Sequence, residues 1–110
     1  MSLRNKVTLI GHTGKDVEIF NFENGNRKAT VTLATNDYYT NSNGEKVEET
    51  QWHNLAAFGK TAEILEKYVP KGKEIAIEGK LTYRSYEDKD GVKRTITEIR
   101  IEELLLLGNK

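Results

Sequence analysis

Two large aromatic residues, Trp52 and Phe58, stand six residues apart in a run whose alternation predicts a β-strand. The even-numbered residues of 52–58 share one side of that strand, and the odd-numbered ones, with Leu55, share the other. Nucleobases can cover an exposed side of this kind, because they stack on aromatic rings for about 1–3 kcal/mol each, whichever base is present. The alternation fits equally well a strand whose aromatic side lies in the core.

Tyrosines in polar segments favour the surface placement of these rings. The pair Tyr38–Tyr39 begins a polar stretch, residues 36–47, that we expect to be a loop. Tyr86 lies close to Arg84, just before a turn signal at residues 90–91. Tyrosines in long polar hairpins have little core to fill, and together with cations they are suited to holding a flexible strand.

The basic and acidic residues balance, at 17 each, so the net charge is zero and the pI is near 6.7. This balance argues against bulk electrostatic capture of duplex DNA, but it is compatible with a groove in which cations are locally concentrated. Among the basic residues on predicted strands and turns, we expect phosphate contacts from Lys6, Lys60, Lys80 and Arg84. The alternative is that these are ordinary solvated side chains.

Groups that could carry catalysis are few. The chain has no cysteine and two histidines, His12 and His53, neither of which belongs to a metal-ligand motif. His53 is expected to form a hydrogen bond in the core or at a subunit contact. Residues 11–14 lack the Lys-Ser/Thr ending of a phosphate-binding loop, and no calcium loop surrounds residues 88–91. We therefore expect no enzymatic activity, no cofactor and no metal site.

Five strands and one helix must position these residues. The predicted strands comprise residues 7–22, bent near Gly14, then about 29–33, 48–58, 75–81 and a last one through residues 99–101 to the terminal leucines. A helix with Thr61 as a possible cap lies between the third and fourth strands, and Pro70 ends it. Asn24–Gly25 indicates a type I′ hairpin turn. This order predicts an all-β fold, a five-stranded OB-fold Greek-key barrel; a generic α+β domain is the alternative.

The length of 110 residues fits one domain, residues 1–110, of which residues 1–3 are expected to be disordered or not native to the chain. The absence of cysteine favours the cytosol. No run is long and apolar enough to span a membrane, and no signal peptide follows Met1, so no membrane contact is expected.

Motifs along nearly the whole chain resemble those of bacterial single-stranded DNA-binding proteins. The similarity lies in Asn5-Lys6-Val7 to Gly11, Gly14-Lys15-Asp16, Thr32-Leu33-Ala34-Thr35, Gln51-Trp52-His53, Phe58-Gly59-Lys60, Tyr68 to Gly72, Ile77-Glu78-Gly79-Lys80-Leu81, Asp90-Gly91 and Leu107-Gly108. Their common order along the chain is more specific than any single motif.

The resemblance implies an OB-fold that binds single-stranded DNA without sequence preference in replication, recombination and repair, usually as a homotetramer. Its stacking residues correspond to Trp52 and Phe58. Two further tryptophans of the family correspond to Tyr39 and Tyr86, whose smaller rings are expected to bind bases more weakly. Asn54 takes the place of a basic residue common in the family, which weakens the case for a phosphate contact there. The resemblance also implies a location in the cytoplasm, on the nucleoid.

The sequence departs from the family after Lys110. The family usually continues into a disordered Gly/Pro/Gln-rich tail with an acidic tip that recruits other proteins. The chain is therefore expected to be a core fragment or a tailless member, and tail-mediated protein partners are expected to be absent.

Two other kinds of OB-fold protein are alternatives to a single-stranded DNA-binding protein. A primosomal-type OB-fold accessory protein would be a dimer, so a tetramer with tight oligo(dT) binding would disfavour it. An OB-fold nuclease would need clustered carboxylates around a divalent metal, and metal-dependent DNA cleavage would identify it.

Overall fold

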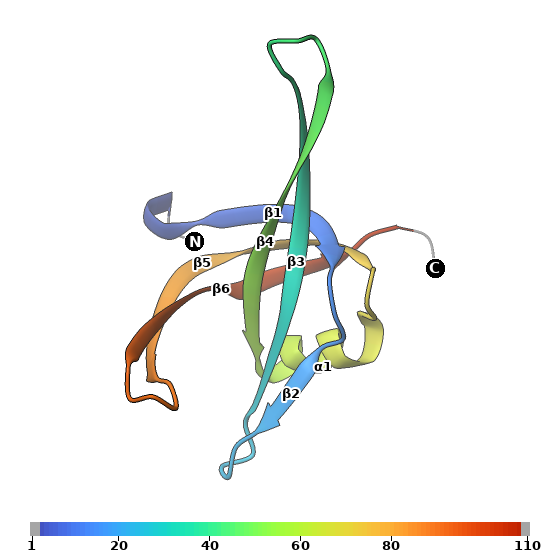
Figure 1. The fold of residues 1–110 in the computed structure, drawn as a ribbon. Helices are drawn as coiled ribbons and strands as arrows, with labels where there is room; N and C mark the ends of the chain where they lie inside the picture. Colours follow the sequence, from blue (N-terminus) through green and yellow to red (C-terminus); the bar gives the residue numbers. More distant parts are fainter. Residues whose placement is uncertain (1–2, 109–110) are drawn as a thin grey trace.

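Apolar residues at alternate positions build one six-stranded sheet that curls around a common core (Figure 1). The structure is a computed structural model that describes residues 3–108. The elements are η1 (Leu3–Asn5), β1 (Val7–Thr13), β2 (Glu18–Asn21), β3 (Arg27–Thr40), β4 (Lys46–Phe58), α1 (Gly59–Tyr68), β5 (Glu74–Glu87) and β6 (Lys93–Leu106). Of the three N-terminal residues expected to be disordered or non-native, Leu3 lies in the short 3-10 turn η1, and residues 1 and 2 lie outside the described residues.

The sheet closes into a barrel with the strand order β1-β5-β6-β4-β3, and β1 returns to β3 through His12 opposite Ala34. All these pairs are antiparallel apart from β4 and β6, which run parallel where Leu55 faces Ile99. β1 and β2 both pair with β3, so they are the two halves of the predicted first strand, separated by the bend at residues 14–17. The structure thus confirms the predicted OB-fold barrel, with α1 between the third and fourth predicted strands.

The core fills the barrel and continues onto one side of α1. Its fully or nearly buried members are Ala29, Val31, Leu33, Leu55, Ala57, Ala62, Leu65, Val69, Ile75, Ile77, Ile99 and Ile101. The expected cap at Thr61 is wrong: α1 begins at Gly59, and Phe58 is the N-cap residue, with extended backbone and no side-chain cap hydrogen bond. The end of the helix before Pro70 is as predicted.

The predicted loop at residues 36–47 is wrong except at its centre, because only residues 41–45 lie outside the strands. β3 and β4 continue past the barrel as a two-stranded ribbon, which projects away from the other strands in Figure 1. Cross-strand pairs such as Tyr39 with Val47 support it without a hydrophobic core. The turn is closed at Asn41, whose Oδ1 accepts hydrogen bonds from the backbone N–H groups of Asn43 and Glu45.

The hairpin between β2 and β3 turns at Asn24–Gly25, but not as a type I′ turn. Gly25 has a φ of 89°, whereas Asn24 does not have a positive φ. The N–H of Phe22 donates to the carbonyl of Asn26, so the connection is longer than the two-residue loop of a type I′ turn. The turn position was predicted correctly and its type was not.

Candidate nucleic-acid interface

The side of β4 that carries Trp52 and Phe58 faces outward. Trp52 is 62% exposed and Phe58 is 37% exposed, whereas Leu55 and Ala57 on the other side of the strand lie in the core. Leu55 is held there by its neighbours Val31 on β3 and Ile99 on β6. The structure therefore selects the surface placement, which the alternation had left open.

The indole of Trp52 lies against the bend between β1 and β2. A Cβ added to Gly14 would collide with the Cζ3 and Cη2 atoms of the indole and would also meet the hydroxyl of Thr32. Trp52 pairs with Ala34, a small residue that leaves space beside the indole. One part of the ring is thus held in place while most of it remains accessible to a stacking partner.

The ring of Phe58 is flanked by two cations. The guanidinium carbon of Arg100 lies 4.5 Å from the ring centroid, and the ammonium of Lys28 lies 5.9 Å from it. Strand register causes this arrangement, because Lys28 pairs with Phe58, and Arg100 pairs with Ala56, two residues before Phe58 on the same side of β4. A base stacked on Phe58 would therefore have positive charge next to its phosphates.

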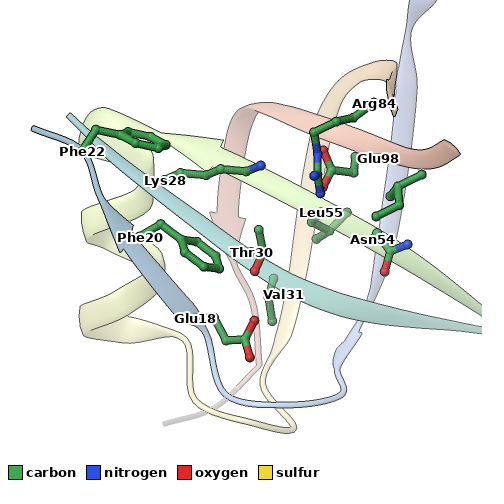
Figure 2. Close-up of a pocket in the computed structure, with 11 residues that line it drawn as sticks. Glu18, Phe20, Phe22, Lys28, Thr30, Val31, Asn54, Leu55, Arg84 and Glu98 are labelled. Atoms are coloured by element: carbon green, nitrogen blue, oxygen red, sulfur yellow. The ribbon is translucent and has the colours of Figure 1, made fainter. Parts of the chain in front are cut away.

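A groove of 420 Å³ crosses the outer side of the barrel between β2 and the β5–β6 hairpin (Figure 2). Phe20 and Phe22 form one side of it, and Arg84 lies on the opposite side. The other lining residues are Glu18, Lys28, Thr30, Val31, Asn54, Leu55, Ile96 and Glu98. This is the side of an OB-fold barrel, between the hairpins, on which oligonucleotides bind in that fold.

Arg84 is held in this groove by a buried carboxylate. Its Nη2 donates to the Oε2 of Glu98 at 3.1 Å, and the side chain of Glu98 is about one-tenth exposed. Tyr86 lies on the same side of β5 as Arg84 by alternation and is exposed.

The turn after Tyr86 is organised by Asp88. Its carboxylate accepts from the Nε of Arg94 at 2.9 Å and from the N–H groups of Val92 and Asp90. These hydrogen bonds, that of Arg94 above all, lower the pKa of Asp88 below its ordinary value. The turn signal at residues 90–91 is therefore confirmed.

The four cations expected at phosphates lie in different places. Lys80 pairs with Arg100, and Arg84 lines the groove, so both lie near the aromatic side chains. Lys60 is exposed in the first turn of α1, two residues after Phe58. Lys6 makes an ion pair with Glu78 at 2.8 Å and is not among the residues that line the groove.

The two tyrosines of the ribbon lie on opposite sides of it. The register is unbroken from Trp52 to the ribbon, so Tyr38 shares the side of Trp52 and Tyr39 lies on the other side. Tyr38 has the ammonium of Lys46 at 4.9 Å from its ring centroid, and its hydroxyl donates to Glu48 at 3.4 Å. The structure brings Trp52, Phe58, Lys80 and Arg84 to one side of the barrel, with Tyr39 away from Trp52.

Residues that the predicted site did not include are Phe20, Phe22, Lys28 and Arg100. Even-numbered positions 18–22 alternate with Val17 and Ile19, which are partly buried against the core, and this pattern was a usable signal for the two phenylalanines. The two cations become recognisable beside Phe58 only when the mutual register of β3, β4 and β6 is known.

His53 forms a hydrogen bond, as expected, but it lies outside the buried core. Its Nε2 lies 3.0 Å from the Oγ1 of Thr35 on β3, in a partly buried position.

Within residues 3–108 there is no group of three or more His, Asp or Glu side chains placed to hold a metal ion. No helix in the same range is long and apolar enough to cross a membrane.

A closed OB barrel with exposed rings and cations on the side between its hairpins has the features of the oligonucleotide-binding class of this fold. Within that class, the family model of the single-strand binding protein family matches residues 4–107, and the chain belongs to this family.

Relatives extend over most or all of the chain. A single-stranded DNA-binding protein of Bacteroides thetaiotaomicron is 45% identical over 108 residues, which are 96% of this chain and 67% of that protein. One from Neisseria meningitidis is 40% identical over 110 residues, which are all of this chain and 63% of the relative. The chain thus spans about two thirds of the length of these relatives. A solved structure of a Plasmodium falciparum SSB complex with ssDNA has a TM-score of 0.86 and 30% identity, and the match covers 98% of this chain and 97% of that one.

Proposed function

We propose that this protein binds single-stranded DNA without sequence preference, and that it thereby protects unpaired DNA during replication, recombination and repair. The observation that carries the proposal is the exposure of Trp52 and Phe58 on the outer side of β4. The family to which the chain belongs and the complex of the Plasmodium relative with ssDNA support it.

The binding mode follows from the rings and the charges. Bases stack on Trp52 and Phe58, and Arg100 and Lys80, which are neighbours across β5 and β6, neutralise phosphates beside Phe58. Because the net charge of the chain is zero, only such local cations contribute electrostatically. Tyr86 adds a weaker contact at the edge of this surface, and Tyr39 adds one on the opposite side of the β3–β4 ribbon. The mode requires no catalytic step, cofactor or metal.

Fluorescence tests this proposal directly, because Trp52 is the single tryptophan of the chain. Titration with an oligo(dT) of about 16 nucleotides, within the range of OB-fold site sizes, should quench most of the emission. A duplex of equal length is the control and should change it little. Unchanged emission at saturating oligo(dT) would show that Trp52 does not stack on DNA.

For the assembly, we propose a homotetramer. An apolar row crosses the outside of β1, β5 and β6, where Ile10 pairs with Ala76 and Ala76 with Leu105. Ile10 and Leu105 are both more than half exposed, which is costly in water. Within the described residues, β1 pairs with β3 only through His12 and Thr13, so residues 7–10 leave one strand edge open. Both features suit contacts between copies of the chain.

Light scattering at micromolar concentration tests the assembly. A mass four times that of the 12.5 kDa chain is expected. A monomer would refute the proposal, and a dimer would favour a primosomal-type accessory protein. We further propose that the protein lies in the cytoplasm on the nucleoid, which imaging of a fluorescent fusion would test.

A further inference from the structure

We propose that Phe20 and Phe22 form an additional base-stacking site at the β2–β3 hairpin, which takes a nucleobase of the same DNA strand that binds Trp52 and Phe58. The inference rests on the proposed function and extends its site. Both rings line the groove opposite Arg84, and neither is part of the core (Figure 2).

Phe20 and Phe22 are too exposed to be stabilised by the core alone. Phe20 is 48% exposed and Phe22 is 47% exposed, although their neighbours Val17 and Ile19 pack against the core. Phe20 lies on β2 and Phe22 directly follows the end of that strand, so the two rings together expose an apolar surface to water, which is unfavourable. An aromatic base has the flat shape that such a surface fits.

Strand register connects this surface to the stacking site on β4. Phe20 pairs with Lys28, and Lys28 pairs with Phe58, so an aromatic, a cationic and an aromatic residue stand side by side on three strands. Two strand spacings separate the outer positions, about 10 Å. This arrangement suits two nucleotides, with one base on Phe20, the other base on Phe58, and the phosphate that links them at Lys28.

The charges of the groove favour that phosphate at Lys28. The two acidic residues of the lining already have cationic partners, Glu18 with Lys15 at 3.8 Å and Glu98 with Arg84 at 3.1 Å. Within residues 3–108, Lys28 makes no ion pair. Its ammonium lies over the ring of Phe58 instead. A phosphate can therefore bind Lys28 without displacing a carboxylate.

A tryptophan probe locates the base. In the double variant Trp52→Phe with Phe20→Trp, the single tryptophan stands on β2, and Phe at position 52 keeps a stacking ring. Saturating oligo(dT) of about 16 nucleotides should quench this new tryptophan. Normal binding by anisotropy of a labelled oligonucleotide, with unchanged tryptophan emission, would overturn the inference.

Affinity measurements give an independent test. Two double variants, Phe20→Ala with Phe22→Ala and Phe20→Leu with Phe22→Ala, should weaken oligo(dT) binding by about 5- to 150-fold. Both remove the π-face of Phe20. The leucine keeps apolar bulk, so it separates the loss of stacking from the loss of apolar surface. Tyr68→Ala is the matched control, because Tyr68 is exposed to a similar extent on α1 and does not line the groove; it should change affinity by less than about twofold. Thermal unfolding of each variant verifies the fold.

The outcomes separate this inference from the proposed function. If the wild-type protein binds no ssDNA, the proposed function fails. If the wild type binds and quenches at Trp52 while the hairpin variants bind equally well, only the additional site is refuted. The additional site would also be refuted if the hairpin variants change the mass measured by sedimentation but keep the DNA affinity, because Phe20 and Phe22 would then be a subunit contact.

Discussion

Removal of the Phe58 ring should cost more DNA affinity than removal of any one cation beside it. Stacking of one base is worth about 1–3 kcal/mol, so Phe58→Ala should weaken binding by about 5- to 150-fold. Each neutralised phosphate of a single strand contributes about 0.7 to the slope of log K against log salt. Between 50 and 200 mM salt, that slope amounts to only about 2.5-fold per phosphate.

The assay is a titration of labelled oligo(dT) at several salt concentrations between these limits. Phe58→Ala leaves Lys28 and Arg100 in place, so affinity should fall by a similar factor at every concentration and the slope should hardly change. Lys80→Ala should weaken binding modestly at low salt and lower the slope by about 0.7. Trp52→Ala should behave as Phe58→Ala does.

The reverse pattern would refute the reasoning. If the aromatic variants only flatten the slope, while Lys80→Ala abolishes binding at all salt concentrations, then the protein binds by charge. The exposed rings would in that case be a contact between subunits.

Gly14→Ala should displace the indole of Trp52, shift its emission maximum and weaken oligo(dT) binding by several-fold, and an unchanged spectrum and affinity would contradict the contact. Glu98→Gln should free Arg84 for one more phosphate and steepen the salt slope by up to about 0.7, whereas an unchanged slope would show that the ion pair does not restrain Arg84. Leu105→Lys should lower the mass measured by sedimentation while each chain still binds oligo(dT), and an unaltered mass would place the subunit contacts elsewhere.

The order of strands and helix along the chain was predictable from sequence, because residues that face the single core of the barrel alternate regularly along most strands. Alternation alone did not decide the placement of Trp52, because both sides of β4 carry large apolar residues. The decision depends on Val31 and Ile99, which meet Leu55 from two strands that are distant in sequence. Periodicity of one strand contains no information on those neighbours.

The ribbon and the groove escaped prediction for a different physical reason. Residues 36–47 have no apolar side, so hydrophobic alternation could not reveal strands that cross-strand pairs and the turn at Asn41 support. Arg100 and Lys28 flank Phe58 through pairings of strands whose mutual register the sequence does not state. Proximity across a sheet is a tertiary property.

The strand pair β3–β4 has two halves with different mechanical properties. Its barrel half is anchored by buried Leu33 and Leu55, whereas the ribbon has water on both sides, so its hydrogen bonds open at low free-energy cost. Tyr38 and Tyr39 are carried by this compliant arm, while Trp52 is held near its base against the body of the protein. Under the proposed binding mode, we expect the tyrosines on this arm to affect mainly the association rate with DNA, and Trp52 on the barrel to affect mainly the dissociation rate. Substitutions on the two halves of this one hairpin should therefore change different rate constants of DNA binding.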